Sequence, residues 1–241
     1  MARLAWLLLC AALPGSALAK LPDDTQPTVL VRAPVDLGDL LLDYNRGLRP
    51  DYGRRPVNVS ASLAFTEARW QRGGLLRAFA FLNLAWSDTR LAFRGAKGEE
   101  IQVRDEALMG KLWLPDVFLP DALDFQLLQP PGLLTLNAQG DVEWSRYVRL
   151  VLSCPLPAAA PYNVCQALLS LESLGYGRSE LSLSWGRGEP GRSLPASSDL
   201  LRLEALAGES KIPRLRAQLS LATPYSDQVV AYLLRKEAGE L

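Results

Sequence analysis

Histidine is missing from this 241-residue sequence. Histidine is the usual general base in enzymes, a member of serine and cysteine catalytic arrangements, and the commonest zinc ligand. Carboxylates or lysines could still support catalysis, but no constellation of them points to a reaction. We therefore expect a protein that is not an enzyme and that works without a cofactor.

Net charge and long apolar stretches are also missing. Lysine plus arginine and aspartate plus glutamate number 26 each, so the charge gives no sign of a polyanionic partner. No basic patch interleaved with aromatic residues is present, which argues against binding of nucleic acid. Beyond the leader described below, no stretch has the roughly 18 uninterrupted apolar residues of a membrane helix. We therefore expect no membrane span in the mature chain.

Three aspartates lie close together in the sequence and could suggest a metal site. They are Asp116, Asp121 and Asp124. An EF-hand calcium loop also needs a central glycine and a terminal glutamate, and this spacing has neither. We therefore expect no metal ion in this protein.

The first 19 residues have the pattern of a secretory signal peptide. A positive residue precedes an apolar run over residues 4–13, and the small residues of a cleavage site stand at 17–19. The run stops at Pro14, short of the roughly 20 apolar residues that a membrane anchor needs. Cleavage would release residues 20–241, which we predict to form one exported domain.

The chain has few cysteines, and their positions predict one disulfide. Of the three, Cys10 lies in the leader, which leaves Cys154 and Cys165. Ten residues separate this pair, so it is not a CxxC redox motif. An even pair in an exported chain predicts a disulfide that closes a small loop, worth about 3 kcal/mol in the chain-entropy model.

The spacing of apolar residues predicts an all-β fold with one leading helix. Over residues 35–48 apolar side chains recur at three- and four-residue steps before Pro50, which predicts an α-helix. The period is two thereafter. Strands are predicted at 57–65, 75–93 with an interruption near Trp86, 133–136, 142–152, 165–174, 180–185, 200–207, 215–222 and 228–235. About ten short strands favour an immunoglobulin-like antiparallel β-sandwich.

Strand parity predicts which side chains face the core. Trp86 shares its parity with a series of leucines and is predicted to be buried, whereas Phe81 lies on the opposite face. Glu143 and Ser145 lie on the face opposite the tryptophan between them. Asn58 begins an Asn-Val-Ser motif, the acceptor for N-glycosylation on an exported chain.

Seven short motifs occur in the order typical of one family. They are Leu41-Leu42-Asp43-Tyr44-Asn45 through Arg49-Pro50, Trp86-Ser87-Asp88, Trp113-Leu114-Pro115-Asp116, Gly140-Asp141-Val142-Glu143-Trp144, Cys154-Pro155, Glu172-Ser173-Leu174-Gly175-Tyr176 and Pro224-Tyr225-Ser226-Asp227. Together they resemble the extracellular ligand-binding domain of the Cys-loop, pentameric ligand-gated ion channels. The acetylcholine-binding proteins are soluble homologues of that domain. The resemblance covers nearly the whole mature chain and implies a ring of five subunits with ligand sites between neighbours.

In that family the ligand site is a box of aromatic rings, whose faces attract a cationic amine. The resemblance assigns six residues of this chain to the site: Phe81, Pro120, Glu143, Ser145, Leu174 and Tyr225. Phe81 and Tyr225 alone among these six keep an aromatic ring. We therefore expect a ligand that differs from a quaternary amine or is more apolar.

Two departures from the family favour a soluble binding protein over a channel subunit. The loop between Cys154 and Cys165 encloses ten residues instead of the usual thirteen and lacks the family's aspartate. The chain also ends at Leu241, about where the family's first membrane helix would begin. We predict a secreted homopentamer that binds a small molecule at its subunit interfaces.

Three alternatives remain open at this point. The chain could be the extracellular domain of a ligand-gated channel, displayed at the surface of the plasma membrane. It could be a ring-forming scaffold that has lost the interface site. A ligand could also bind in the central vestibule of the ring.

Overall fold

The computed structural model describes residues 36–71, 73–95, 98–154, 162–186, 201–206 and 212–224. All of them belong to one unit, Val35–Leu241. The leader, the strand expected at 228–235 and the tip of the loop between the two cysteines lie outside the described residues. In the described part of the chain, no helix has the length and apolar character needed to cross a membrane.

The leading helix is much shorter than the sequence pattern predicts. Helix α1 spans Leu37–Leu40 and is capped by Asp36, whose carboxylate accepts a hydrogen bond of 2.8 Å from the backbone N–H of Gly38. Farther on, the side chain of Asn45 accepts a bond of 2.9 Å from Gly47 N–H. Such a local side-chain turn competes with helical hydrogen bonding, so the chain continues in turns up to Pro50. The prediction of one helix over 35–48 is wrong in its extent.

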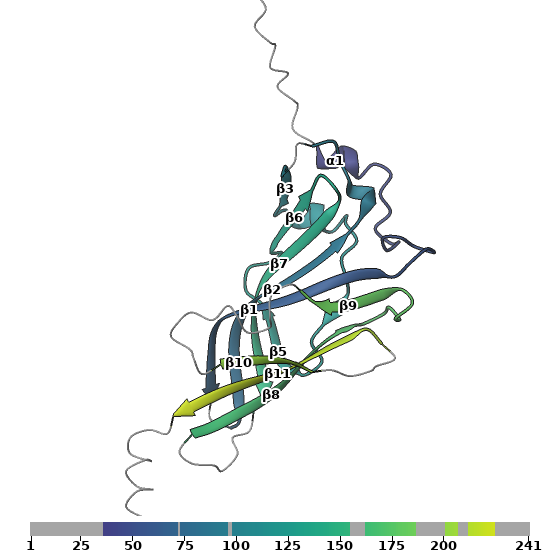
Figure 1. Ribbon diagram of the computed structural model, residues 1–241. Helices are drawn as coiled ribbons and strands as arrows, with labels where there is room; N and C mark the ends of the chain where they lie inside the picture. Colours follow the sequence, from purple (N-terminus) through teal and green to yellow (C-terminus); the bar gives the residue numbers. More distant parts are fainter. Residues whose placement is uncertain are drawn as a thin grey trace, which may run out of the picture. The chain divides into compact units, whose positions relative to one another are not determined.

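Two β-sheets make up most of the described structure (Figure 1). The larger sheet has the order β3-β6-β7-β2-β1-β9, and β5 also pairs with β7. Its strands are β1 (Val57–Gln71), β2 (Leu75–Ser87), β3 (Glu100–Val103), β5 (Ala122–Leu127), β6 (Leu133–Asn137), β7 (Asp141–Ser153) and β9 (Leu181–Trp185). The smaller sheet has the order β10-β11-β8-β4, built from β4 (Val117–Phe118), β8 (Tyr162–Ser173), β10 (Leu201–Leu206) and β11 (Arg214–Pro224).

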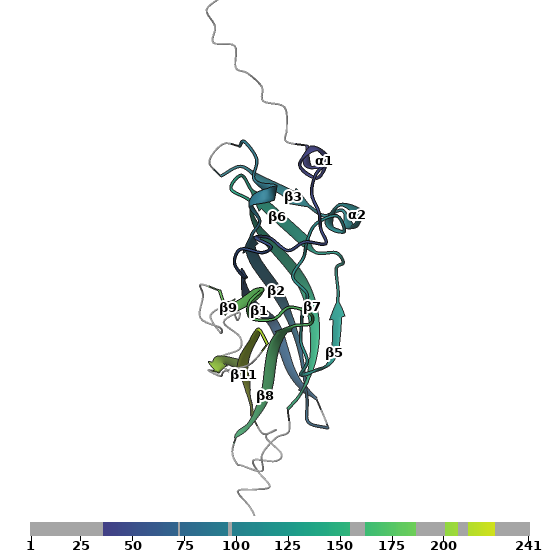
Figure 2. The ribbon, with the colours of Figure 1, turned by 90° about the vertical axis from the view of Figure 1, so that its right-hand side faces the viewer.

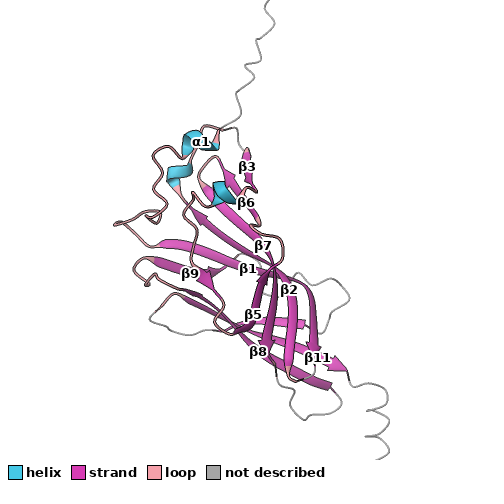
Figure 3. Cartoon of the chain, turned by 180° about the vertical axis from the view of Figure 1, so that it is seen from behind, coloured by secondary structure: helices cyan, strands magenta, loops and turns pink. Residues whose placement is uncertain are grey.

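The two sheets share one core, and Figure 2 shows β8 and β11 as a second layer beside β1, β2 and β7. The short helices α1 and α2 (Glu106–Met109), with the 3-10 turn η1 (Thr89–Leu91), gather near β3 and β6 (Figure 3). The predicted all-β sandwich with a leading helix is therefore confirmed.

One pairing departs from the antiparallel rule that holds for the other described ladders. Strand β9 lies parallel to β1, with Val57 opposite Leu181. It reaches that edge after β8, a strand of the other sheet, instead of through a hairpin with β1. A strand that arrives by a crossover can enter a sheet in either direction, whereas a tight hairpin forces antiparallel pairing.

Alternation along β2 builds the centre of the core. Trp86 is 4% exposed and shares its face with leucines and alanines that are fully buried, whereas Phe81 points to the other face and is 42% exposed. Both predictions from parity are confirmed. Each fully buried leucine contributes about 1.5–3 kcal/mol to folding, so this stripe of β2 is a main source of stability.

The predicted disulfide between Cys154 and Cys165 is present. Cys154 follows β7 of the larger sheet and Cys165 lies in β8 of the smaller one, with their Cα atoms 5.2 Å apart. Both cysteines are fully buried. The backbone N–H of Cys154 also donates to the carbonyl of Gly74 in the turn between β1 and β2. The disulfide therefore ties the two sheets together beside that turn.

A polar network holds the turns after α1 against the end of β2. Asp88 is fully buried, and its carboxylate accepts hydrogen bonds from the hydroxyl of Tyr44 at 2.7 Å and from Arg90 Nη2 at 2.7 Å. The Tyr44 oxygen in turn accepts from the backbone N–H of Trp113 at 3.0 Å. Burial, followed by the bond to Asp88, raises the pKa of Tyr44. We refer to Tyr44, Asp88, Arg90 and Trp113 as the Asp88 network.

Candidate ligand-binding site

An aromatic pair lies on the outward face of the larger sheet. Phe81 of β2 is directly opposite Tyr147 of β7, and their ring centroids are 4.8 Å apart. Tyr147 is held in place because its hydroxyl shares a hydrogen bond of 3.2 Å with Thr66 Oγ1 on β1. Ser145 is the next outward residue along β7 and pairs with Leu133 of β6. Three neighbouring strands thus present one surface built around two rings.

This pair forms the floor of a pocket of about 400 Å³. The size is within the range of small-molecule sites, roughly 300–1,000 Å³. The residues that line it are Phe81, Arg104, Gln129, Pro130, Pro131, Gly132, Leu133, Ser145 and Tyr147. We call this the Phe81 pocket.

The segment between β5 and β6 makes one wall of the Phe81 pocket. It approaches β7 closely, since Leu128 N–H donates to the carbonyl of Tyr147 at 2.9 Å. Gly132 has φ +92°, and a Cβ at this position would lie 2.5 Å from the Ser145 carbonyl oxygen. Glycine is therefore required for this approach. On the other side of the strand, Trp144 Nε1 donates to the Pro131 carbonyl at 3.1 Å and fixes the wall from behind.

The chemistry of the Phe81 pocket favours a ligand with an apolar body and a hydrogen-bond acceptor. Two aromatic rings and two proline rings provide the apolar surface. Arg104 is the one charged side chain among the described lining residues, and its Nη2 donates to Gln102 Oε1 at 3.3 Å. A guanidinium at the rim attracts a carboxylate and opposes a cationic amine, even though aromatic faces alone would attract one.

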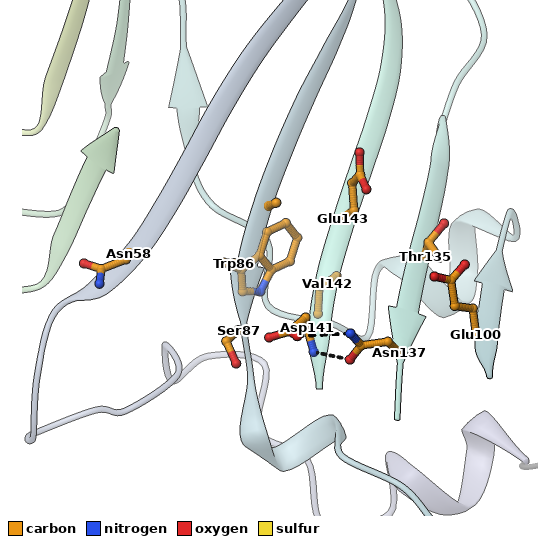
Figure 4. A pocket seen from close by; sticks show the side chains of 10 residues that line it. Asn58, Trp86, Ser87, Glu100, Thr135, Asn137, Asp141, Val142 and Glu143 are labelled. Carbon is orange, nitrogen blue, oxygen red and sulfur yellow. Dashed lines mark hydrogen bonds between the residues drawn. The ribbon is translucent and has the colours of Figure 1, made fainter. Parts of the chain in front are cut away.

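Glu143 does not join the Phe81 pocket. It lines a separate hollow of about 380 Å³ on the same sheet, with Glu100 and Asp141 (Figure 4). The described residues that line this hollow include three carboxylates and no lysine or arginine. Asp141 Oδ2 accepts a bond of 3.0 Å from Asn137 Nδ2. Across the described ranges, no group of three side chains is arranged to hold a metal ion.

Asn58, the first residue of the glycosylation motif, also lines this hollow, near the start of β1 (Figure 4). Its side chain is exposed.

Leu174 and Pro120 lie elsewhere, at the two ends of the short ladder between β4 and β8. Leu174 is 78% exposed, and its backbone N–H donates to the carbonyl of Asp116 just before β4. Pro120 follows β4 and is exposed. Neither residue lines the Phe81 pocket. Tyr225 lies outside the described residues. Of the six residues assigned from the resemblance, the structure therefore brings together Phe81 and Ser145.

The Trp113-Leu114-Pro115-Asp116 motif has a structural role. The two carboxylate oxygens of Asp116 accept bonds of 2.6 Å from Ser173 Oγ and from Gly175 N–H. Nearby, Trp113 Nε1 donates to the hydroxyl of Tyr176 at 2.9 Å. These contacts fix the turn after β8, and with it the position of the exposed Leu174.

Several lining residues of the Phe81 pocket were missed from the sequence. Tyr147 has the same parity as Ser145, so the argument that selected Ser145 could have selected it too. Arg104, Gln129 and Pro131 gave no comparable signal, because they reach the pocket from irregular segments whose path is set by the tertiary fold.

Comparison with known proteins agrees with this architecture. The family model described as neurotransmitter-gated ion-channel ligand binding domain matches residues 36–218. The glycine receptor subunit beta of Mus musculus is 28% identical over 181 residues, which are 70% of this chain and 36% of that protein. The gamma-aminobutyric acid receptor subunit pi of Bos taurus is 28% identical over 156 residues, which are 62% of this chain and 35% of that protein.

The two-sheet sandwich, the disulfide between its sheets and the family match define an extracellular ligand-binding domain of the Cys-loop receptor class. The chain belongs to the family of neurotransmitter-gated ion-channel ligand-binding domains. It spans about a third of the length of the curated relatives it matches.

Proposed function

We propose that this chain is a secreted, soluble subunit that assembles into a homopentamer and binds a small molecule in the Phe81 pocket at each subunit interface. The observation that carries the proposal is an outward-facing aromatic pair, the exposed Phe81 and the half-buried Tyr147, at the floor of a pocket. The family resemblance assigns Phe81 to the strand that faces the neighbouring subunit. An open pocket on such a surface would be closed by the next copy in the ring.

The ligand we propose carries a carboxylate next to a compact apolar body. Arg104 would take the carboxylate, since a guanidinium pairs well with it, and the rings would cover the apolar part. The two relatives described above are named for glycine and gamma-aminobutyric acid, both of which carry a carboxylate. No acidic side chain is among the described lining residues, which supports the same ligand class.

A thermal-shift screen tests this site. Glycine, gamma-aminobutyric acid and a panel of larger carboxylates would be added to the wild type, Phe81→Ala and Tyr147→Ala. Phe125→Ala is a matched control, because Phe125 is 41% exposed on β5 and lies outside the pocket, while Phe81 is 42% exposed. We expect at least one compound to stabilise the wild type and Phe125→Ala and to lose its effect on the two pocket variants. Stabilisation that is equal in all four proteins would contradict the site.

Assembly and export have separate tests. Native mass measurement of secreted material is expected to give five times the mass of one mature chain, and isolated single chains would contradict the ring. N-terminal sequencing is expected to begin near Lys20. Asn58 is exposed, so we propose that it carries a glycan. Treatment with an N-glycosidase should then lower the mass, and Asn58→Gln should remove that change.

A channel subunit is the second candidate function. It is favoured by the coverage of about a third of the glycine and gamma-aminobutyric acid receptor subunits, which leaves most of their length unmatched. A transcript that encodes four further apolar segments after residue 241 would establish it. The Phe81 pocket would have the same role in that case, so the ligand screen applies to both candidates.

A scaffold that has lost its ligand site is the third candidate. Pro120 and Leu174 support it. Both are exposed, and neither has an aromatic side chain, although the resemblance leads one to expect one at each position. Pentamers in which no compound of the panel stabilises the wild type would favour this candidate over ligand binding.

A further inference from the structure

Arg146 occupies a position in β7 that the strand pattern reserves for apolar side chains. Val148 and Leu150, on the same face of the strand, are both fully buried. Its partner across the ladder is Leu82 of β2, which is fully buried too. An arginine at this register is exceptional, because moving a charge away from water costs several kcal/mol unless the charge is paired.

The guanidinium of Arg146 is held but not neutralised. Its central carbon lies 3.9 Å from the centroid of the Trp144 ring, which fixes the plane of the group. Nε and Nη2 are both buried and have no hydrogen-bond partner among the described residues. Burial lowers the pKa of Arg146 to about 10, and no carboxylate opposes that shift. The group therefore stays charged at neutral pH without a counter-charge.

Two other arginines, Arg149 and Arg90, do have carboxylate partners. Arg149, three residues along the same strand, bonds to Asp124 at 2.7 Å. Arg90 bonds to the buried Asp88. The Nε and Nη2 donors of Arg146 are buried away from water and yet face no acceptor among the described residues, which sets Arg146 apart from both.

The two unpartnered nitrogens have the geometry of a carboxylate receptor. Nε and Nη2 form one edge of the guanidinium, and two parallel N–H groups on such an edge match the two oxygens of a carboxylate. Arg146 also lies at a break in the edge of β7, between the ladder to β6, which reaches Ser145, and the ladder to β5, which begins at Val148. The residue keeps some exposure to solvent there.

We propose that Arg146 binds a carboxylate at this break, in a bidentate pair with Nε and Nη2. The site is distinct from the Phe81 pocket, because Arg146 faces the other side of β7 and is not among the residues that line the pocket. The carboxylate comes either from a small molecule in solution or from an acidic side chain of a second copy. The segment 128–132 must shift to admit it, since Gly132 packs against the stem of Arg146.

Thermal unfolding of the mature chain at constant ionic strength tests this proposal. Chloride would be replaced stepwise by acetate for the wild type, Arg146→Met, Arg146→Lys and Arg149→Met. We expect the thermal unfolding midpoint of the wild type to rise by about 3–5 °C and then to level off. A rise of this size is what a chain of this length shows when acetate is present at about ten times its dissociation constant. Arg149→Met should keep this rise and Arg146→Met should lose it. Arg146→Lys keeps the positive charge but lacks the two parallel N–H groups, so it should lose most of the acetate-dependent rise. This variant still tests the proposal if Arg146→Met does not fold.

A separate measurement tests whether the carboxylate comes from a second copy of the chain. If the carboxylate belongs to another copy, acetate has no effect, and the wild-type midpoint rises with protein concentration while that of Arg146→Met rises less. Because Arg104 of the Phe81 pocket is also proposed to pair with a carboxylate, both measurements are repeated in an Arg104→Met background. The difference that Arg146→Met makes should persist there, so failure of the Phe81 pocket does not affect this result. The proposal is overturned if the wild type and Arg146→Met respond alike to both acetate and protein concentration.

Discussion

The Asp88 network lies just beyond the end of β2, the strand that carries Phe81, and the two regions treat their side chains in opposite ways. In the Asp88 network each polar group finds a partner inside the protein, and Asp88 is fully buried. In the Phe81 pocket large apolar rings remain open to solvent. The first arrangement gains its stability on folding, whereas the second leaves surface that only a ligand or a neighbouring copy can cover. Stability and recognition are thus assigned to different regions, one on β2 and one just beyond its end.

Removing the centre of the Asp88 network should have the largest effect on stability. Asp88→Ala leaves the Tyr44 hydroxyl and the Arg90 guanidinium without their shared acceptor. We expect a loss of about 3–5 kcal/mol in the free energy of unfolding, as for other buried ion pairs that lose one partner, measured by urea denaturation. Asp124→Ala is the control, because its partner Arg149 is part-exposed and such a pair is worth at most about 1 kcal/mol. Equal losses in the two variants would contradict the distinction between the regions.

A methyl group on the wall of the Phe81 pocket should have the next largest effect. Gly132→Ala places a Cβ against the Ser145 carbonyl at a positive φ. We expect a loss of about 1–3 kcal/mol and a weaker response to any ligand that stabilises the wild type. Gly53→Ala is a matched control, since its φ is also positive, at +74°, but nothing lies within 4 Å of the added Cβ. If Gly53→Ala cost as much, backbone strain alone would explain the loss.

The pH dependence of stability should report on Tyr44. Its pKa is raised in the folded state, so the neutral phenol is favoured there and the resulting stability is present below the unfolded pKa of about 10. This contribution is lost as pH rises from about 10 through the folded pKa. We expect Tyr44→Phe to lower stability by about 1–2 kcal/mol at neutral pH through its missing hydrogen bonds. The free energy of unfolding of the same variant should also fall less steeply as the pH becomes alkaline. Chemical denaturation at a series of pH values between 7 and 11 measures this. An unchanged alkaline slope would contradict the role of Tyr44.

Phe81→Ala should change stability least. The ring is partly exposed already, so we expect a loss of about 1 kcal/mol or less in the free energy of unfolding. Trp86→Ala, five residues along the same strand, should cost about 3–5 kcal/mol, since that ring is buried against Trp113. A large loss for Phe81→Ala would mean that the pocket floor belongs to the core.

Much of the fold followed from the sequence because strand parity and turn residues are local signals. The faces of Phe81 and Trp86 were predictable in this way. The disulfide was predictable from the one cysteine pair that remains after the leader. The helix was overestimated because its apolar spacing is also satisfied by turns that pack Leu41 and Tyr44 on the core.

The site was harder to predict for a physical reason. Glu143 and Ser145 share a face, yet the segment between β5 and β6 covers the strand near Ser145 and leaves Glu143 in a different hollow. Parity gives a side of the sheet and not the path of an irregular segment across it. Parity places Arg146 with Trp144 and Val148 on the core face of β7, yet a lone arginine within a strand is ordinarily taken for a solvent-exposed residue.

The position of the disulfide also predicts where the sandwich opens first. Cys154 bonds to the turn at the far end of β1, while β9 pairs with the opposite end of that strand through residues Val57–Ala61. Local opening concentrates where few contacts restrain an edge. Amide hydrogen exchange should therefore be fastest at β9 and slow progressively along β1 toward the cross-link.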